Sequence, residues 1–427
     1  MGAYSPSWFG EIRCGEERGE RPGYCKDMKL KSILIAHPWM GRGGSEATAM
    51  WLLQALQDDF NVSFVTAGPI DWAELNGAYG TSVDSRKISV IRAPRIPTVD
   101  GPAKLVQLQL RYFERFCHRI SEGFDICASA YNPIDFGRPA IQLMGDFSED
   151  MRKRLYIHGE GQFRHRESFF RAIYLKLSEW LGVRVTPLRD RDDLILANSE
   201  WCAEQLSQHF SISDAPVLYP PVMLPTVVRN SHRDPLGFVC LGRVVPEKEI
   251  ERIISILKSV RELGYPVTLR LLGALDDSDY SSRVAALVAE ESWIQPEGFL
   301  QLNEKQDVLS SMSFALHACR IEAFGIAVAE MASMGCIPFV PDTGGAGEIV
   351  SLPELQFGCD DEAVEKIVAL LENPERTGEI RNLLPQEMNR FGPDVFMREI
   401  RNYVLDFSGR RNRSVDATIE QNPAKVS

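Results

Sequence analysis

The chain of 427 residues has the composition of a globular protein, with 44% hydrophobic and 25% charged residues, and it is long enough for two α/β domains. Its formal net charge of -12 excludes a general nucleic-acid-binding protein, which would need a basic surface. The sequence holds neither an apolar run of the roughly 18 to 20 residues that a membrane span requires nor a signal-peptide apolar region, so we expect a soluble or peripheral protein.

Both ends of the sequence are polar. Residues 1–27 show no hydrophobic periodicity, and MKLKSILIAH begins at Met28 as a natural first strand. We expect residues 1–27 to be a disordered leader, or a segment translated from an upstream start codon. Residues 408–427 (SGRRNRSVDATIEQNPAKVS) are expected to form a disordered tail.

The first half begins with a strand, a turn and a helix. KSILIAH (31–37) is typical of a buried parallel strand, PWMGRGGS (38–45) is a glycine-rich turn, and EATAMWLLQALQDD (46–59) predicts an amphipathic helix. NVSFVTAG (61–68) follows as the next strand. This pattern predicts a βαβ unit.

The same pattern restarts after Pro220. LGFVCLG (236–242) predicts a strand, IERIISILKSVRELG (250–264) a helix and VTLRLLG (267–273) a second strand. The fold class is therefore α/β, with two doubly wound Rossmann-like domains.

The domain boundaries follow from these patterns. We predict an N-terminal domain over residues 28–218 and a C-terminal domain over 219–395, joined at the proline-rich YPPVMLP. Residues 396–407 predict a helix that packs back across the joint.

The nine cysteines are odd in number and form no CxxC pair. Several lie in apolar runs, such as Cys240 in GFVCLG and Cys336 in GCIPFV. We expect free, buried thiols in a reducing, cytoplasmic compartment, and no metal site.

The glycine turn GRGGSE invites comparison with the GxGxxG of dinucleotide-binding proteins. An NAD site needs an acidic residue at the end of the second strand, and FVTAGPI offers none. Two interpretations stay open: the turn only lets a strand meet a helix, or the backbone of Gly43 and Gly44 approaches the phosphate or sugar of a ligand.

RIEAFGIAVAE places two carboxylates, Glu322 and Glu330, around the start of a helix. The preceding SFALHAC (313–319) predicts a strand, and ligands of open parallel sheets bind outside the carboxyl ends of the strands. A helix N-terminus favours anions, whereas carboxylates suit hydroxyl groups. The simplest ligand with both is a sugar nucleotide; the alternative is a pair of ordinary surface charges.

Two cations follow the first strand of the second half, Arg243 and Lys248 in GRVVPEKE. Facing a diphosphate leaving group, they would neutralise the charge that develops as the glycosidic bond breaks, typically worth about 10²–10³-fold in rate. The alternative for Lys248 is a solvated charge. The loop PDTGGAGEIV adds Gly344, Gly345 and Glu348 beyond the next strand, so we expect a third strand end to point at the same place.

These motifs together resemble a known family. GRVVPEK, the two glutamates of EAFGIAVAE, MASMGCIPFV and the GGAGE loop closely resemble the retaining glycosyltransferases of family 4, which have the GT-B fold. In the first half, LYIHGEG, ILANSEWCAEQL, VLYPPV and HPWMGRGGSE are similar to segments of the mannosyltransferases that extend the lipid-linked oligosaccharide of N-glycosylation.

The resemblance implies roles for the two domains and for individual residues. The N-terminal domain would face the acceptor and the C-terminal domain would bind the nucleotide sugar. Glu330 would bind the ribose diol, Glu322 would lie beside the donor sugar, and Arg243 and Lys248 would hold the diphosphate. The backbone amides near the sugar and diphosphate would be those of Phe324, Gly325 and Ile326.

His158 in YIHGEG matches the histidine that this family places over the donor sugar. His37 in IAHPWM is the competing histidine, since it also lies at a predicted strand end.

The resemblance further implies a metal-independent transfer of a hexosyl unit, with retention, from a nucleotide sugar to a hydroxyl of a glycan or polyprenyl-linked acceptor. GDP-mannose is the first choice of donor, followed by UDP-hexoses, and no cofactor is expected. The alternatives are a GT-B epimerase or phosphorylase and a non-catalytic sugar-nucleotide-binding protein.

A basic and aromatic segment precedes the joint and predicts either a peripheral membrane contact or an ordinary solvated helix face. Its members are Arg152, Lys153, Arg154, Arg164, Arg166, Arg171, Lys176 and Arg184, interleaved with Phe169, Phe170, Tyr174 and Trp180.

Overall fold

The computed structural model describes residues 30–41, 43–96, 105–147, 173–174, 176–178, 180, 186–225 and 232–421, with side chains as far as residue 409. The predicted leader, His158 and most of the basic segment lie outside these residues.

The first half contains a parallel sheet of six strands in the order β3-β2-β1-β4-β5-β6. The strands are β1 (Ser32–Ala36), β2 (Asn61–Thr66), β3 (Ile88–Arg92), β4 (Ile126–Ser129), β5 (Ile141–Met144) and β6 (Leu194–Ala197). The helices of this half are α1 (Gly44–Leu56), α2 (Trp72–Tyr79), α3 (Val106–Ile120) and α6 (Glu200–Phe210), with short 3-10 turns at Ser121–Gly123 and Leu188–Asp190.

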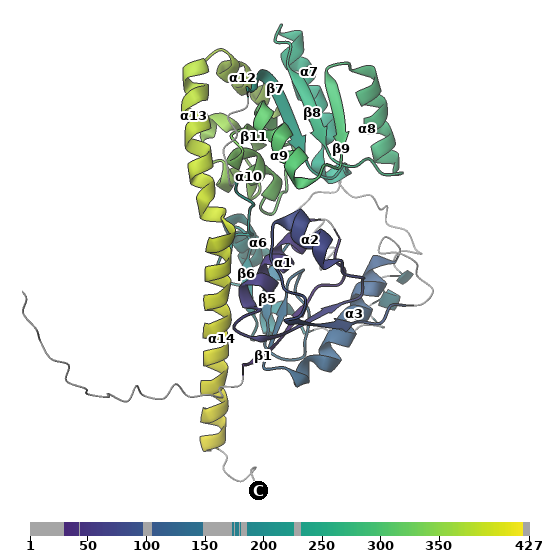
Figure 1. Ribbon diagram of the computed structural model, residues 1–427, viewed down its shortest axis with the longest axis vertical. Helices are drawn as coiled ribbons and strands as arrows, with labels where there is room; N and C mark the ends of the chain where they lie inside the picture. Colours follow the sequence, from purple (N-terminus) through teal and green to yellow (C-terminus); the bar gives the residue numbers. More distant parts are fainter. Residues whose placement is uncertain are drawn as a thin grey trace, which may run out of the picture. The chain divides into compact units, whose positions relative to one another are not determined.

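The second half repeats this topology in the order β12-β11-β10-β7-β8-β9 (Figure 1). The strands are β7 (Asp234–Leu241), β8 (Thr268–Leu272), β9 (Ile294–Gly298), β10 (Met312–Leu316), β11 (Ile337–Pro341) and β12 (Gln356–Phe357). Between them lie α7 (Ile250–Glu262), α8 (Asp279–Glu290), α9 (Leu302–Ser311), α10 (Ile326–Ser333) and α11 (Ala346–Ile349), followed by α12 (Asp360–Leu371) and α13 (Pro374–Glu387). Further 3-10 turns are η4 (Pro246–Lys248), Pro353–Leu355 and Met388–Phe391.

Both sheets have the strand order of the doubly wound fold, which reverses direction between the first and fourth strands. The prediction of two parallel Rossmann-like sheets is confirmed. In the second half the reversal lies between β7 and β10, which pair directly. Ligands of such sheets bind at this point, so the residues that follow β7 and β10 are the first place to look for a site.

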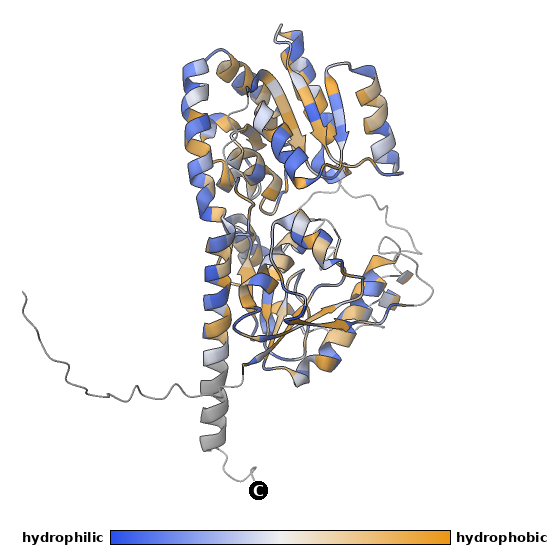
Figure 2. Cartoon of the chain, viewed as in Figure 1, coloured by the Kyte–Doolittle hydropathy of each residue, from blue (hydrophilic) through white to orange (hydrophobic). Residues whose placement is uncertain are grey.

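The central strands are apolar on both faces because helices cover both sides of each sheet. Every residue of β10 and β11 is buried, and Phe238 of β7 stacks on Phe314 of β10 and Phe339 of β11. Figure 2 shows β7 as mostly hydrophobic, whereas α13 carries long hydrophilic stretches. The seven cysteines among the described residues are free, and all but Cys359 are buried, as predicted.

The last helix, α14 (Pro393–Gln421), returns to the first half. Phe396, Ile400, Val404 and Phe407 share one face of this helix and are buried in the same hydrophobic cluster as α1 and β1. The helix continues to Gln421, where a disordered tail was predicted from Ser408. Gly409 alone is too weak a helix breaker to end it, and no proline occurs between Pro393 and residue 423.

Candidate functional site

Glu322 and Lys248 meet where the strand order of the second sheet reverses. Lys248 ends the 3-10 turn that follows β7, and Glu322 lies in the loop between β10 and α10. The Lys248 ammonium donates a hydrogen bond to Oε2 of Glu322. The loops that follow two adjacent strands therefore place opposite charges in contact at the predicted ligand position.

Both members of this pair are charged at neutral pH. Burial raises the pKa of Glu322, but the charge of Lys248 and the nearby His317 ring more than offset burial and hold that pKa well below its usual range. Burial lowers the pKa of Lys248, and the Glu322 carboxylate reverses the effect, so the net pKa is raised. The side chains are only 21% and 18% exposed, which strengthens the interaction relative to a surface ion pair.

His317 is a third member of the site that the sequence analysis did not single out. Its side chain is 4% exposed, and its Nε2 lies 3.3 Å from Oε2 of Glu322. Burial lowers the pKa of His317 despite the nearby Glu322, so the ring is neutral near pH 7. One signal could have found it, since His317 directly follows the apolar run of β10 at the strand's carboxyl end.

The helix that begins at Ile326 presents an uncapped N-terminus beside Glu322. Its N-cap, Gly325, has a left-handed backbone with φ 102° and no side chain that could bond the first amides. A Cβ at Gly325 would lie 3.2 Å from Cγ of Glu322, so glycine also allows the close approach of that side chain. Exposed backbone amides at a helix N-terminus favour a bound anion.

Glu330 lies one turn further along α10 and contacts a different cation. Both of its carboxylate oxygens are 3.0 Å from Nζ of Lys305, which belongs to α9. The two residues line a small cavity of about 10 Å³. The other lining residues are Met223, Leu302, Gln306, Leu309 and Met334. Each of the two glutamates of the motif is thus held by its own lysine.

The predicted glycine pair after β11 supports the loop that carries Glu322. The amide of Gly345 donates to the Glu322 carbonyl over 2.7 Å, and a Cβ at this glycine would lie 2.2 Å from the carbonyl oxygen of Ala323. Gly344 has φ 81°, and a Cβ there would lie 2.8 Å from the same Glu322 oxygen. Because the Gly345 amide already donates to a carbonyl of the protein, the role of Gly345 is to hold the backbone of the Glu322 loop.

Only the backbone of Phe324 is available to a ligand at the start of α10. Its side chain is 2% exposed and packs against Tyr219 and Phe391, with ring centroids 5.7 and 5.1 Å away. Arg243 lies in the loop after β7 with an exposed side chain, near enough for its charge to oppose that of Lys248.

Glu348 differs from expectation. Its carboxylate does not join the other strand ends but accepts hydrogen bonds from the backbone amides of Glu200 and Trp201 at 2.9 and 2.6 Å, at the start of α6. The N-terminus of α6 attracts the carboxylate in the same way as any anion, and Ser199 of that helix also donates to the Ala323 carbonyl.

The glycine turn of the first half lies against the start of α10. A Cβ at Gly44 would be 2.9 Å from Cδ1 of Ile326, so only a glycine fits there without movement. The amide of Gly43 donates to the Tyr79 hydroxyl, which itself donates to the Gly41 carbonyl, so Tyr79 holds the turn in shape.

His37 is fully buried at the end of β1, and burial lowers its pKa although Glu46 opposes this. Its ring lies edge-on to Tyr131 with centroids 5.3 Å apart. A buried imidazole cannot touch a substrate in this arrangement, and its competitor His158 lies outside the described residues.

Residues 228–384 match the family described as glycosyl transferases group 1. The second half of the chain thus resembles a group 1 glycosyltransferase domain. The recognition made from the sequence is thereby confirmed for the half that contains Glu322 and Glu330.

Curated relatives are similar to part of the chain. The chain is 26% identical over 167 residues to the GDP-Man:Man(3)GlcNAc(2)-PP-Dol alpha-1,2-mannosyltransferase of Eremothecium gossypii, a match that covers 36% of the chain and 29% of the relative. The enzyme of the same name from Debaryomyces hansenii is 27% identical over 197 residues, covering 40% of the chain and 32% of the relative. The chain thus matches about a third of the length of these relatives.

Solved structures show the same GT-B fold over most of the chain. Sucrose-phosphate synthase from Thermosynechococcus elongatus aligns with a TM-score of 0.66 and 14% identity, covering 91% of the chain and 100% of that structure. Anabaena HepE in complex with UDP-glucose aligns with a TM-score of 0.62 and 16% identity, covering 88% and 100%.

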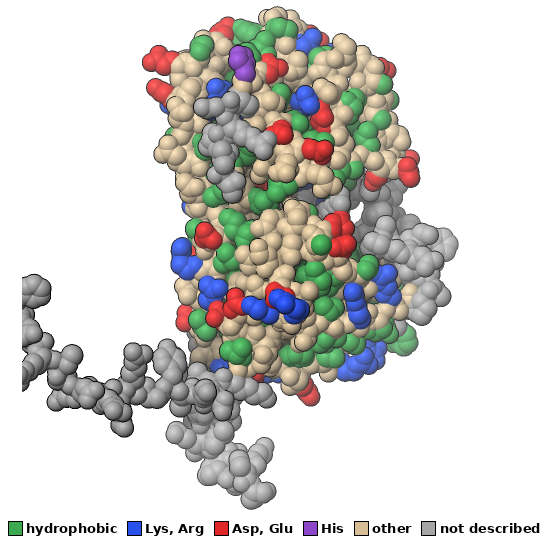
Figure 3. Space-filling model, in the orientation of Figure 1, with side chains coloured by type: hydrophobic (Ala, Val, Ile, Leu, Met, Phe, Trp, Pro, Cys, Tyr) green, Lys and Arg blue, Asp and Glu red, His purple; other side chains and the backbone are tan. Residues whose placement is uncertain are grey.

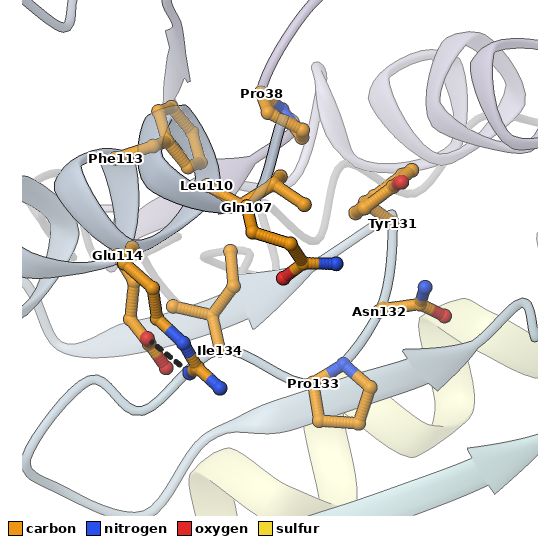
Figure 4. A pocket seen from close by; sticks show the side chains of 10 residues that line it. Pro38, Gln107, Leu110, Phe113, Glu114, Tyr131, Asn132, Pro133 and Ile134 are labelled. Carbon is orange, nitrogen blue, oxygen red and sulfur yellow. Dashed lines mark hydrogen bonds and ion pairs between the residues drawn. The ribbon is translucent and has the colours of Figure 1, made fainter. Parts of the chain in front are cut away.

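The first half of the chain also has a cavity of about 50 Å³ at the carboxyl edge of its sheet. Figure 4 shows Gln107 projecting from α3 toward Tyr131 and Asn132, with Pro38, Leu110 and Pro133 around it. Arg111 is paired with Glu114 at 2.8 Å, so this cation is neutralised by its neighbour. The lining combines an aromatic ring, apolar groups and amides, which suits an uncharged polar ligand better than an anion.

Proposed function

We propose that the chain is a retaining glycosyltransferase that moves a hexosyl unit from a nucleotide sugar to an acceptor hydroxyl. The observation that carries this proposal is the pair of lysine-held carboxylates, Glu322 and Glu330, one on each side of the uncapped start of α10. A diphosphate suits the helix start, and the hydroxyls of a sugar and a ribose suit the two carboxylates.

Each of these groups has a role in the proposed donor complex. The amides of Gly325 and Ile326 receive the diphosphate, and Lys248 and Arg243 neutralise its charge. Lys248 is bound to Glu322, so the donor phosphate competes with Glu322 for this ammonium. Glu322 then accepts hydrogen bonds from the donor sugar, and Glu330 accepts them from the ribose diol. The close approach of Gly44 to Ile326 supports a contact of the glycine turn with the same ligand.

The reaction that fits this site proceeds on one face of the donor sugar. The bond between the anomeric carbon and the phosphate oxygen breaks, the acceptor oxygen bonds to the same carbon, and the acceptor proton passes to the departing phosphate. Positive charge from Lys248, Arg243 and the helix start stabilises the diphosphate as it leaves. His158 is assigned to the donor sugar by its motif.

For the donor we propose GDP-mannose, supported by the two fungal relatives, whose names specify it. UDP-hexoses are the second choice, supported by the complex of the structural neighbour HepE with UDP-glucose.

For the acceptor we propose a lipid-linked glycan, as in the names of the same relatives. Ile173, Leu177 and Trp180 recur at helical spacing with 49%, 47% and 77% of their surfaces exposed, and Lys176 beside them is exposed. Apolar side chains with an adjacent cation suit the surface of an anionic membrane. None of the described helices is long and apolar enough to cross a membrane, so the proposed contact is peripheral.

The first experiment is a thermal-shift screen of GDP-mannose, GDP-fucose, UDP-glucose, UDP-galactose, UDP-N-acetylglucosamine and NAD. A donor at about 100 times its dissociation constant should stabilise the fold by roughly 2.7 kcal/mol. The Glu330→Gln variant should lose most of this shift, and Glu365→Gln, which changes an exposed glutamate on α12, should keep it. A shift with NAD alone would contradict the proposal. Transfer from the donor so identified to a glycan then separates a transferase from an epimerase.

A further inference from the structure

We propose that His317, Cys319 and Glu322 form a binding site for a thiophilic divalent cation such as Zn²⁺, and that this cation excludes the sugar-nucleotide donor. The second clause rests on the proposed function, whereas the first does not. The sequence has no CxxC pair, and no metal site was predicted from it.

The three side chains converge at the carboxyl end of β10. One ligand atom from each, the histidine nitrogen, the cysteine sulfur and a glutamate oxygen, lies within 4.8 Å of the other two. A tetrahedral ion with bonds of about 2.0 to 2.3 Å would draw the three atoms closer together than this. The three ligands follow the pattern His-x-Cys-x-x-Glu and lie in the segment that directly follows β10.

The histidine supplies an independent observation that points to a ligand. His317 is 3% exposed, and its Nε2 makes no hydrogen bond of acceptable geometry to the described residues, although Oε2 of Glu322 lies 3.3 Å away. A buried polar nitrogen without a partner costs free energy, which a bound cation would recover. Cys319 is likewise buried, at 5% exposure.

The donor set has the chemistry of a zinc site. Imidazole, thiolate and carboxylate together suit Zn²⁺ and Co²⁺, and three protein ligands leave one position open to water. On binding, the Cys319 thiol gives its proton to solvent, so the ion meets one thiolate, one carboxylate and a neutral imidazole, and its two positive charges are balanced.

In the structure, the ammonium of Lys248 supplies the positive charge beside Glu322. Its ammonium binds the same Oε2 of Glu322 that the ion would coordinate, and its side chain is 21% exposed, so it can turn toward solvent. The ion reaches the cluster by the exposed side of Glu322 and Lys248. Because both residues belong to the proposed donor site, ion and donor cannot bind together.

The test is a Co²⁺ titration of the full chain, followed by the thiolate-to-cobalt absorption band. We expect a band at one equivalent in the unaltered protein. Cys319→Ala, which keeps the apolar character of the position, should lose it, and Cys319→Ser serves as a second variant if the first unfolds. Cys359→Ser, which removes the exposed thiol of the same half, should keep the band. A band that survives in both Cys319 variants would overturn the site.

The exclusion of the donor is tested separately. Zn²⁺ should abolish the donor-induced thermal shift of the unaltered protein. The Cys319 variants lack a direct ligand, so they should need more metal by at least the roughly 10- to 100-fold that loss of an outer-shell partner costs. Without metal, those variants should bind donor as before. A cobalt band with an unchanged donor shift would overturn the exclusion. If no sugar nucleotide binds at all, the proposed function fails while the band still decides the metal site.

Discussion

Lys248 donates a hydrogen bond to Glu322 from a loop 74 residues earlier in the chain. The two loops follow β7 and β10, which are distant in sequence and paired in the sheet. The strand order of the sheet therefore brings the two residues together. Their interaction can be tested by replacing either Lys248 or Glu322.

Replacing Lys248 with methionine should leave Glu322 buried without its counter-ion. Removing one partner of a buried pair costs up to roughly 3–5 kcal/mol, and loss of a cation at the leaving group should reduce the transfer rate by about 10²–10³-fold. Urea unfolding and donor kinetics would measure the two effects. The double variant Lys248→Met, Glu322→Gln should be less destabilised than the sum of the single changes; simple additivity would show that the two side chains do not interact.

The stability that this pair contributes should depend on pH. The folded-state pKa of Glu322 lies below its ordinary value of 4.5, so its contribution is fully present above about pH 4.5 and is lost as the pH falls through the folded-state pKa. In Lys248→Met only burial and His317 act on Glu322, so its pKa should rise and protonation should relieve the variant. The difference in free energy of unfolding between the two proteins should therefore shrink from pH 7 toward pH 4. A difference that stays constant would contradict this assignment.

Glu330→Gln should weaken donor binding more than it slows turnover. A hydrogen bond to a charged group contributes about 1.5–3 kcal/mol, so the KM for the donor should rise by roughly 10- to 100-fold. Lys305→Met should also raise KM, because Lys305 holds both oxygens of Glu330 in place. Steady-state kinetics over donor concentration would show whether KM or kcat changes. A fall in kcat alone would place Glu330 at the reacting carbon instead of the ribose.

Gly345→Ala should displace the loop that carries Glu322. The new methyl group would lie 2.2 Å from the carbonyl oxygen of Ala323, a backbone atom that cannot turn aside. We expect a loss of about 1–3 kcal/mol in stability together with loss of donor binding. Gly347→Ala is the matched control, since its methyl group would meet Gln356 at an ordinary 3.6 Å. Equal effects of the two changes would exclude the close approach as the cause.

The sequence predicted the strands and helices best where continuous apolar runs are bounded by glycine. KSILIAH became β1, and the helix expected after Gly325 begins at Ile326. Contacts between segments that are distant in the sequence could not be predicted. The bond from Lys305 to Glu330 and the turn of Glu348 toward α6 depend on which loops the sheet brings together, which spacing along one chain does not encode.

The sequence gives the net charge of the protein but does not predict how the charged side chains are distributed over its surface. The acidic net charge is not gathered on the face shown in Figure 3, where Asp and Glu lie interspersed with Lys and Arg. Mixed charges of this kind fit an enzyme whose ligands are recognised in local sites.

The return of α14 has a consequence for how the protein is made. Phe396, Ile400, Val404 and Phe407 fill the core beside α1 and β1, yet the ribosome adds them after β12. The first sheet therefore emerges during translation with part of its apolar surface uncovered, and it becomes complete only when the last helix has left the exit tunnel. A nascent chain stalled before Pro393 should expose this surface to chaperones, while its second sheet is already whole.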